Sequence, residues 1–214
     1  MPESKPRPYR IGATLRTTDT ALLRGFAALH ASGCIDHIQV RVIPGGTFSR
    51  DLAAIAASGV PAAIHAPHHG HGVNPCAPAA YDDRPLAEIK AHIELAMNQT
   101  LEAADTLGAE TIIIHAGWYE PGGRSAALDE FSRFLDRHFD PRLTLENLPA
   151  VFRGRPMLGT TAEELAALAG GRLQGFCLDF AHLYCAANYL KIPYPEALEP
   201  FQALTIRHFH LSNT

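Results

Sequence analysis

Thr111-Ile-Ile-Ile-His-Ala-Gly117 is the stretch of this 214-residue sequence that is most informative about its fold. Three consecutive isoleucines with no polar alternation are typical of a strand that is buried on both faces of a parallel sheet. This strand ends on a polar side chain, His115, and a turn residue, Gly117, follows soon after. The stretch therefore predicts a parallel α/β sheet with a chemically competent group at the carboxyl end of a strand.

Similar short apolar runs recur along the whole chain, and helix-period segments lie between most of them. The expected strands are Tyr9–Leu15, His37–Ile43, Ala62–His65, Thr111–His115, Leu143–Asn147, Gly175–Asp179 and Ile206–Leu211. The expected helices are Asp19–Ala31, Ser49–Ala57, Pro85–Leu107, Ser125–His138, Thr161–Ala169 and Pro195–Leu204. Strands that alternate with helices over a whole chain predict a parallel sheet with right-handed crossovers.

Two features favour a (β/α) TIM barrel over a Rossmann sheet. The first crossover contains no G-x-G-x-x-G motif, and the sequence contains no P-loop. Polar residues also stand at the carboxyl ends of nearly all the expected strands, which is where barrels carry their chemistry. Because no linker or shift in composition marks a second domain, we expect residues 1–214 to form one TIM-barrel domain.

Bulk composition excludes several classes of protein. A hydrophobic content of 47% with 19% charged residues is that of a globular protein, and the formal net charge of −4 gives no general attraction to nucleic acid or anionic lipid. The four cysteines show no C-x-x-C spacing, so we expect reduced thiols, with Cys177 buried and inert. The N-terminal stretch lacks the apolar core of a signal peptide, which favours a soluble, cytoplasmic protein without a membrane partner.

Five consecutive expected strands each end in a side chain that can bind a metal ion. In chain order these side chains are His65, His115, Glu146, Asp179 and His210. A single histidine at a strand end is more often a surface or hydrogen-bonded residue, but in a barrel all five would ring one pocket. Glu146 and Asp179 buried together without a cation would repel each other. The pattern predicts a divalent-metal site suited to Zn²⁺, and acceptable for Mn²⁺ or cobalt.

Loops after the expected strands offer further candidates for contact with a substrate. Adjacent histidines in His68-His-Gly-His-Gly72 cannot all face one ion, so we expect this loop to be a flexible rim in which His68 and His69 touch substrate. Trp118 is a candidate for stacking on a sugar or base, although packing within the rim explains it equally well. Arg16 and Arg41 could meet an anionic group of the substrate, but Arg41 could equally neutralise Asp36 or a neighbouring carboxylate, so neither is assigned to the site.

These motifs resemble those of the xylose isomerase-like TIM barrels, a family that includes endonuclease IV and many sugar isomerases and epimerases. The resemblance covers nearly the whole chain in strand order. It rests on the Glu146-Asn147 pair, the Asp179-x-x-His182 motif and the segment His210-Leu-Ser-Asn213, which look like the family's metal-binding strand ends. His65 and His115-Ala-Gly117 match the additional histidines of endonuclease IV-like members.

The resemblance implies roles for these residues. In the endonuclease-like arrangement His65 and His115 would hold one ion with Glu146, which would bridge to a second ion held by Asp179 and His210. In the sugar-active arrangement Glu146, Asp179 and His210 would hold a single ion, and Glu146 would also transfer a proton. Asn147 would bind substrate. In the endonuclease branch the residue like His182 completes a third zinc site, but the other ligands of that site are missing here, so we favour His182 as a substrate-binding residue that assists catalysis over His182 as a metal ligand.

One part of the family pattern is missing from these residues. Both branches take a further glutamate ligand from an eighth strand, and the endonuclease branch takes an Asp and a His after the seventh, whereas this sequence ends at Thr214. We therefore expect a barrel that lacks strand eight and is incomplete at its C-terminus. Its exposed sheet edges would favour pairing with another chain, which predicts a homodimer.

Three functions remain open at this point. The favoured one is a sugar or keto-acid isomerase or epimerase, in which the metal stabilises an enediolate and Glu146 is the base or its partner. The alternative is an endonuclease IV-like zinc phosphodiesterase acting on abasic-site DNA; the sequence has no clustered Lys/Arg run or evident wedge for opening a duplex. The third is a truncated, non-catalytic metal-binding barrel.

Overall fold

A computed structural model describes residues 9–80 and 83–212, so Asn213 of the C-terminal motif lies outside the described residues. Within these ranges the main sheet has seven strands in the order β1-β2-β3-β4-β5-β8-β9, and all neighbouring strands are parallel. The strands are β1 (Gly12–Arg16), β2 (His37–Arg41), β3 (Ala62–His65), β4 (Ile112–Ile114), β5 (Leu143–Glu146), β8 (Gly175–Asp179) and β9 (Ile206–His210). The seven expected strands are therefore confirmed in order and direction.

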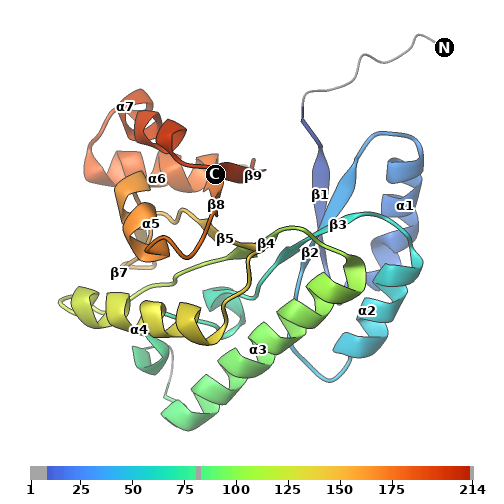
Figure 1. Ribbon diagram of the computed structural model, residues 1–214, viewed down its shortest axis with the longest axis horizontal. Helices are drawn as coiled ribbons and strands as arrows, with labels where there is room; N and C mark the ends of the chain where they lie inside the picture. Colours follow the sequence, from blue (N-terminus) through green and yellow to red (C-terminus); the bar gives the residue numbers. More distant parts are fainter. Residues whose placement is uncertain (1–8, 81–82, 213–214) are drawn as a thin grey trace.

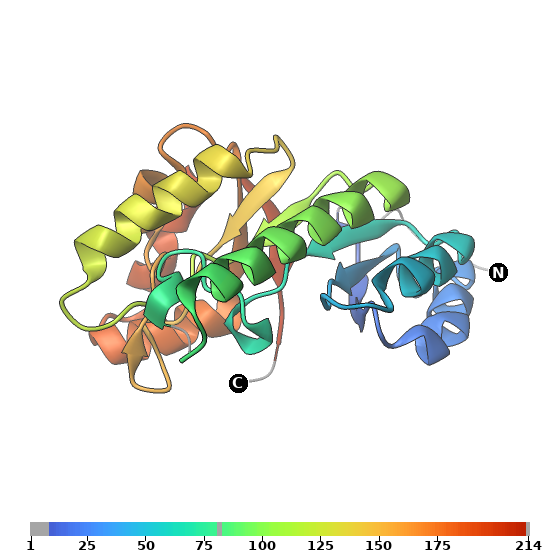
Figure 2. The same ribbon diagram turned by 90° about the horizontal axis from the view of Figure 1, so that it is seen from below.

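The sheet curls into an open half-barrel, and the helices surround its outer side (Figures 1 and 2). Among the described strands, β1 and β9 each pair with one neighbour only, so the ring is open between them. The helices are α1 (Leu23–Ala31), α2 (Phe48–Ala57), α3 (Leu86–Leu107), α4 (Arg124–Arg137), α5 (Ala162–Ala169), α6 (Phe180–Leu190) and α7 (Tyr194–Leu198). This is a TIM-barrel arrangement that lacks one strand, as the sequence predicts. No helix within the described ranges is long and apolar enough to cross a bilayer.

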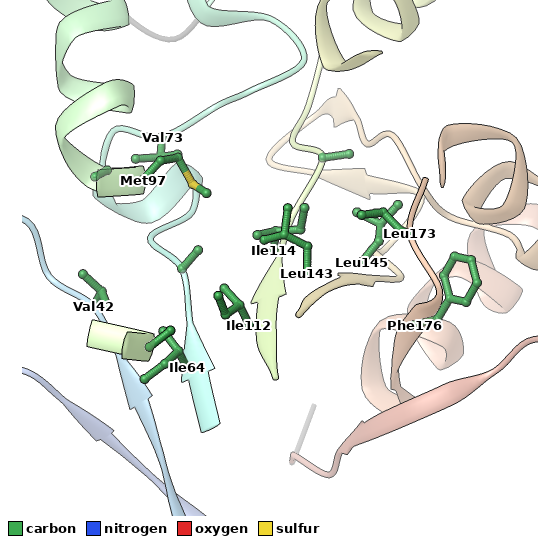
Figure 3. Close-up of a cluster of buried hydrophobic side chains, with 14 of the residues drawn as sticks. Val42, Ile64, Val73, Met97, Ile112, Ile114, Leu143, Leu145, Leu173 and Phe176 are labelled. Carbon is green, nitrogen blue, oxygen red and sulfur yellow. The ribbon is translucent and has the colours of Figure 1, made fainter. Parts of the chain in front are cut away.

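Alternation along each strand separates the core from the site. On β4 and β5 the side chains of Ile112, Ile114, Leu143 and Leu145 are buried in one hydrophobic cluster between sheet and helices (Figure 3). The residue after Leu145 points to the opposite face, because strand side chains alternate with a period of two. That residue is Glu146, which lies inside the curl, so burial of the leucines on the outer face fixes the direction of the carboxylate.

Three features of the fold differ from the sequence-based expectations. The expected C-terminal helix is split into α7 and a 3-10 helix, Glu199–Ala203. A small antiparallel hairpin, β6 (Val151–Phe152) with β7 (Arg155–Pro156), follows β5 and was not expected. Helix α6 was also missed, because its sequence FAHLYCAANYL is apolar around most of its circumference and shows no clear amphipathic period.

Candidate metal centre

Glu146, at the carboxyl end of β5, is the centre of the site. Its side chain is 1% exposed, and its two oxygens contact four imidazoles. Oε2 lies 2.9 Å from Nε2 of His115 and 3.3 Å from Nε2 of His65. Oε1 lies 3.0 Å from Nδ1 of His210 and 3.2 Å from Nδ1 of His182. Imidazoles from three strand ends and one helix therefore meet around one buried carboxylate.

Asp179, at the end of β8, adds a second buried carboxylate to the same place. Its Oδ2 lies 3.8 Å from Nδ1 of both His182 and His210. Its Oδ1 accepts a hydrogen bond of 2.8 Å from the backbone N–H of His182, so Asp179 also caps helix α6. The structure thus brings together all five residues that the sequence singles out as ligands.

The ligand atoms fall into groups that share Glu146. Those containing Glu146 are His65–His115–Glu146, Glu146–Cys177–His210 and Glu146–Asp179–His182, each with its ligand atoms within 4.8 Å of one another. A carboxylate with ligands on both sides can hold one ion at either oxygen or bridge two ions. Cys177 is 0% exposed as expected, and burial, followed by the nearby Glu146 carboxylate, holds the pKa of its thiol well above the ordinary value.

The hydrogen bonds of two histidines show that the donor set fits a cation. Nδ1 of His65 lies 2.7 Å from the backbone oxygen of Ala66, so it donates its proton there and leaves a lone pair on Nε2. Nε2 of His210 lies 2.6 Å from Oε1 of Gln39, which leaves the lone pair on Nδ1. Both lone pairs face Glu146 oxygens, an arrangement that a shared cation stabilises. Metal-bound histidines commonly donate their other N–H to an oxygen in this way.

Electrostatics keep these groups in the protonation states that bind metal ions. Burial alone would raise the pKa of Glu146, but the surrounding imidazoles, His115 foremost, hold that pKa well below its ordinary value. Burial lowers the pKa of His115 to about 3 even though the Glu146 carboxylate opposes the shift. The site therefore presents an ionised carboxylate and a neutral His115 ring near neutral pH, as metal coordination requires.

His182 differs from the other histidines. Burial acts to lower the pKa of His182, but Glu146 outweighs it and the net shift is upward. Its Nδ1 lies 2.9 Å from the backbone oxygen of Asn147, and its side chain keeps 29% of its surface exposed. The Nδ1 proton is thus held inside the site while the outer part of the ring remains accessible, an arrangement compatible with proton exchange.

Asn147 does not have the surroundings expected of a substrate-binding residue. It is 0% exposed, and both ends of its amide bond the backbone of Asp179: Oδ1 accepts from the Asp179 N–H at 2.7 Å, and Nδ2 donates to the Asp179 oxygen at 3.0 Å. With its amide committed to the neighbouring strand, Asn147 fixes the position of Asp179. The sequence did not reveal this partner, and substrate binding by Asn147 stays a prediction.

We expect Asn147→Asp to weaken metal binding by about 10- to 100-fold, because substitution of a residue that hydrogen-bonds to a metal ligand commonly lowers metal affinity by that much. The substitution keeps the shape of the side chain but turns the donor that faces the Asp179 oxygen into a charged acceptor. Metal titration by calorimetry measures the effect, with circular dichroism to verify folding. Asn188→Asp on exposed α6 is the matched control; equal metal affinity in both variants would contradict the assigned role.

Trp118 is also placed differently from the expectation. Its side chain is 4% exposed and packs against Leu148 and Met157, and the guanidinium carbon of Arg155 lies 3.9 Å from the ring centroid. A ring covered in this way has no free face on which a sugar or base could stack. Trp118 therefore packs the rim, which is the other role that the sequence left open.

His68 and His69 lie closer to the ligands than a flexible rim implies. Their ring centroids are 5.1 Å and 6.3 Å from that of His115, and the three residues form a fourth group of potential metal ligands. The side chain of His68 accepts the backbone N–H of Gly70 and so caps a 3-10 turn. Phe152 of the β6–β7 hairpin packs against His69, with their ring centroids 4.6 Å apart.

Gln39 is the residue that sequence reasoning missed. It is 5% exposed and holds His210 through the 2.6 Å contact described above. The available signal was its position between Ile38 and Val40, both 0% exposed on the outer face, since alternation then turns Gln39 inward.

Parallel strands curled inside a layer of helices, with metal-competent side chains at their carboxyl ends, define a protein of the TIM-barrel class. More particularly, the fold is similar to the folds of solved epimerase and endonuclease IV structures, in agreement with the resemblance that the sequence motifs indicate. No family model matches the sequence, and no curated protein matches it either.

Three solved structures illustrate the likeness. A D-tagatose 3-epimerase-like protein is 20% identical with a TM-score of 0.64, over 94% of this chain and 76% of that one. D-psicose 3-epimerase, solved in the presence of D-fructose, is 14% identical with a TM-score of 0.61, over 94% and 72%. Endonuclease IV from Thermus thermophilus is 21% identical with a TM-score of 0.56, over 92% and 74%. At these identities the likeness establishes the fold alone.

Proposed function

We propose that this chain is a divalent-metal-dependent isomerase or epimerase that acts on a sugar or keto-acid. The observation that carries the proposal is Glu146, a buried carboxylate with histidine nitrogens at 2.9–3.3 Å around both of its oxygens. Glu146, Asp179 and His210 would hold a Zn²⁺ or Mn²⁺ ion, with His65 and His115 as further ligands. The folds of two named epimerase structures support this class of function.

When bound, the ion supplies Lewis-acid polarisation of a substrate carbonyl and offsets the negative charge of the enediolate. The proton beside that carbonyl must then move to a protein group. The low pKa of Glu146 makes it a weak base on its own, whereas the raised pKa of His182 favours it as the proton carrier near neutral pH. Nδ1 of His182 lies 3.2 Å from Glu146 Oε1, so the two residues can share one proton.

One observation favours a second candidate, an endonuclease IV-like zinc phosphodiesterase. His65 and His115 meet one oxygen of Glu146 while His182 and His210 meet the other, which suits a pair of ions bridged by a carboxylate. The zinc-type alternative is supported by this ligand set and by the fold of endonuclease IV. A metal-binding barrel without turnover is the third candidate.

Solvent-proton exchange tests the proposed function. With protein loaded with Zn²⁺ or Mn²⁺ in D₂O, we expect deuterium to enter the carbon beside the carbonyl of a ketose or keto-acid from a panel, as seen by NMR. His182→Asn should slow the exchange by about 100- to 10,000-fold, the usual contribution of a general acid–base group. His30→Asn on α1 is the control variant.

The same protein should leave an abasic-site duplex uncut. Incision of the duplex without exchange into any member of the panel would replace the proposal with the phosphodiesterase. Neither activity in protein with stoichiometric metal would favour the non-catalytic barrel.

A further inference from the structure

A second polar feature borders the metal centre, on the side of β1 and β2. Arg16 and Arg41 are register partners on these two strands, and Arg41 is in turn the register partner of His65 on β3. Each is the last residue of its strand, so the three stand in a row at the carboxyl ends. Neighbouring strands are about 4.8 Å apart, so the Cα atom of Arg41 is one strand spacing from that of His65, and Arg16 is two.

Neither arginine forms an ion pair within the described part of the chain. Burial lowers the pKa of Arg41, and the Glu146 carboxylate opposes this shift only in part. The arginines that form ion pairs in the described residues are others, such as Arg50, Arg124 and Arg172. Asp36, which the sequence offered as a partner of Arg41, directly precedes β2 at the end opposite to Arg41. Its carboxylate accepts a hydrogen bond from the backbone N–H of Ile11. The Nε atom of Arg41 is buried and has no hydrogen-bond partner. A buried guanidinium nitrogen without an acceptor is destabilising, as are like charges directly opposite on neighbouring strands.

A third donor lies on the same side. Nδ1 of His71, in the loop after β3, is also buried without a partner. Burial lowers the pKa of His71, and the positive charges of Arg41 and Arg16 act in the same direction. A neutral imidazole can donate one hydrogen bond through this nitrogen.

We propose that Arg41, Arg16 and His71 form a subsite for an oxyanion, a phosphate monoester or carboxylate carried by the substrate. Arginine suits this ligand because its planar fork matches the paired oxygens of both groups. An anion there accepts from Arg41 Nε, accepts from His71 Nδ1 and separates the two guanidinium charges. The assignment rests on the proposed function and narrows its substrate to an anionic sugar or keto-acid.

The Cα spacing along this row of residues is compatible with a small substrate. One to two strand spacings, or roughly 5–10 Å, separate the arginines from the ligand His65. A chain of a few carbon atoms spans this distance, so the reacting carbonyl and the oxyanion can belong to one small molecule.

The test uses the metal-loaded full chain and inorganic phosphate as the probe. Calorimetry should give a dissociation constant that rises by about tenfold or more in Arg41→Gln, because charge-assisted bonds of this kind are lost. Bound metal per chain should not change. Arg41→Lys keeps the positive charge but not the planar fork of the guanidinium, so its dissociation constant for phosphate should lie between those of the wild type and Arg41→Gln. This variant takes the place of Arg41→Gln if Arg41→Gln does not fold. Arg24→Gln on α1 is the matched control.

The remaining comparisons separate this inference from the proposed function. In the deuterium-exchange assay, the rates with a ketose phosphate and with a keto-acid are each compared with the rate for the unmodified ketose. The faster of the two identifies which oxyanion the subsite binds. Arg41-dependent phosphate binding without exchange would retain the subsite and reject the isomerase. Exchange with equal phosphate affinity in wild type and Arg41→Gln would reject the subsite, as would Arg41-dependent binding confined to duplex DNA.

Discussion

Glu146→Gln is expected to abolish stoichiometric metal binding and, with it, any metal-dependent activity. The substitution keeps the volume of the side chain but removes the charge that both pairs of histidines face. Removal of one partner from a buried charged pair costs about 3–5 kcal/mol, which corresponds to a loss of metal affinity of about a thousandfold. Elemental analysis after gel filtration, and the rise in Tm on adding zinc, measure the loss.

Glu102→Gln is the control for this prediction, because Glu102 lies exposed on the outer helix α3. It should bind as much metal as the wild type. Asp179→Asn should weaken binding less than Glu146→Gln, since the carboxylate of Asp179 approaches the nearest imidazole nitrogens only at 3.8 Å. If neither Glu146→Gln nor Asp179→Asn changes the metal content, the site described here is not a metal centre.

The strand ends could be predicted because two simple rules act on them together. Alternation fixes which side chain of a strand faces inward, and parallel strands bring their carboxyl ends to one rim. The expected bounds of β3 and β8 agree with the structure, and both strands end on a candidate ligand, His65 and Asp179. Neither rule depends on the details of packing, so the convergence of the five candidate side chains at one rim could be predicted from the sequence.

The roles of the surrounding residues depend on contacts between distant segments. Asn147 bonds a strand 32 residues away, and Gln39 bonds His210 across 171 residues. Whether Trp118 faces a substrate depends on a hairpin of four strand residues, too short to give a pattern in the sequence. Local patterns identify candidate residues, but tertiary contacts decide whether each one binds, supports or packs.

Gly117→Ala is the second substitution with a large expected effect, and it acts through the support of the site. Gly117 has a φ of +108°, and an added Cβ would overlap Oδ1 of Asn74 and lie 3.2 Å from its Cγ. Asn74 is 0% exposed; its Oδ1 accepts the Trp118 N–H at 2.8 Å, and its Nδ2 donates to the oxygens of Trp118 and Ala77. Asn74 thus joins the loop after β3 to the loop after β4.

Displacing this amide would leave buried backbone groups unpaired and strain the backbone, so we expect the free energy of unfolding to fall by about 3–5 kcal/mol. Gly122→Ala is a matched control, because Gly122 also has a positive φ, +83°, but open space around its Cβ position. It should cost only about 1–2 kcal/mol, the usual penalty for a left-handed alanine. Denaturant unfolding of both variants isolates the contribution of the contact with Asn74.

The same substitution should also weaken metal binding, because Gly117 lies two residues after His115. Combining Gly117→Ala with Asn74→Ala removes the steric overlap but does not restore the hydrogen bonds that Asn74 makes. The double variant should therefore regain only part of the free energy of unfolding that Gly117→Ala loses. Equal losses in Gly117→Ala and Gly122→Ala would mean that backbone conformation alone requires glycine at position 117. A larger loss at Gly117, together with lower metal affinity, would show that the loop after β3 holds the ligand at the end of β4 in place.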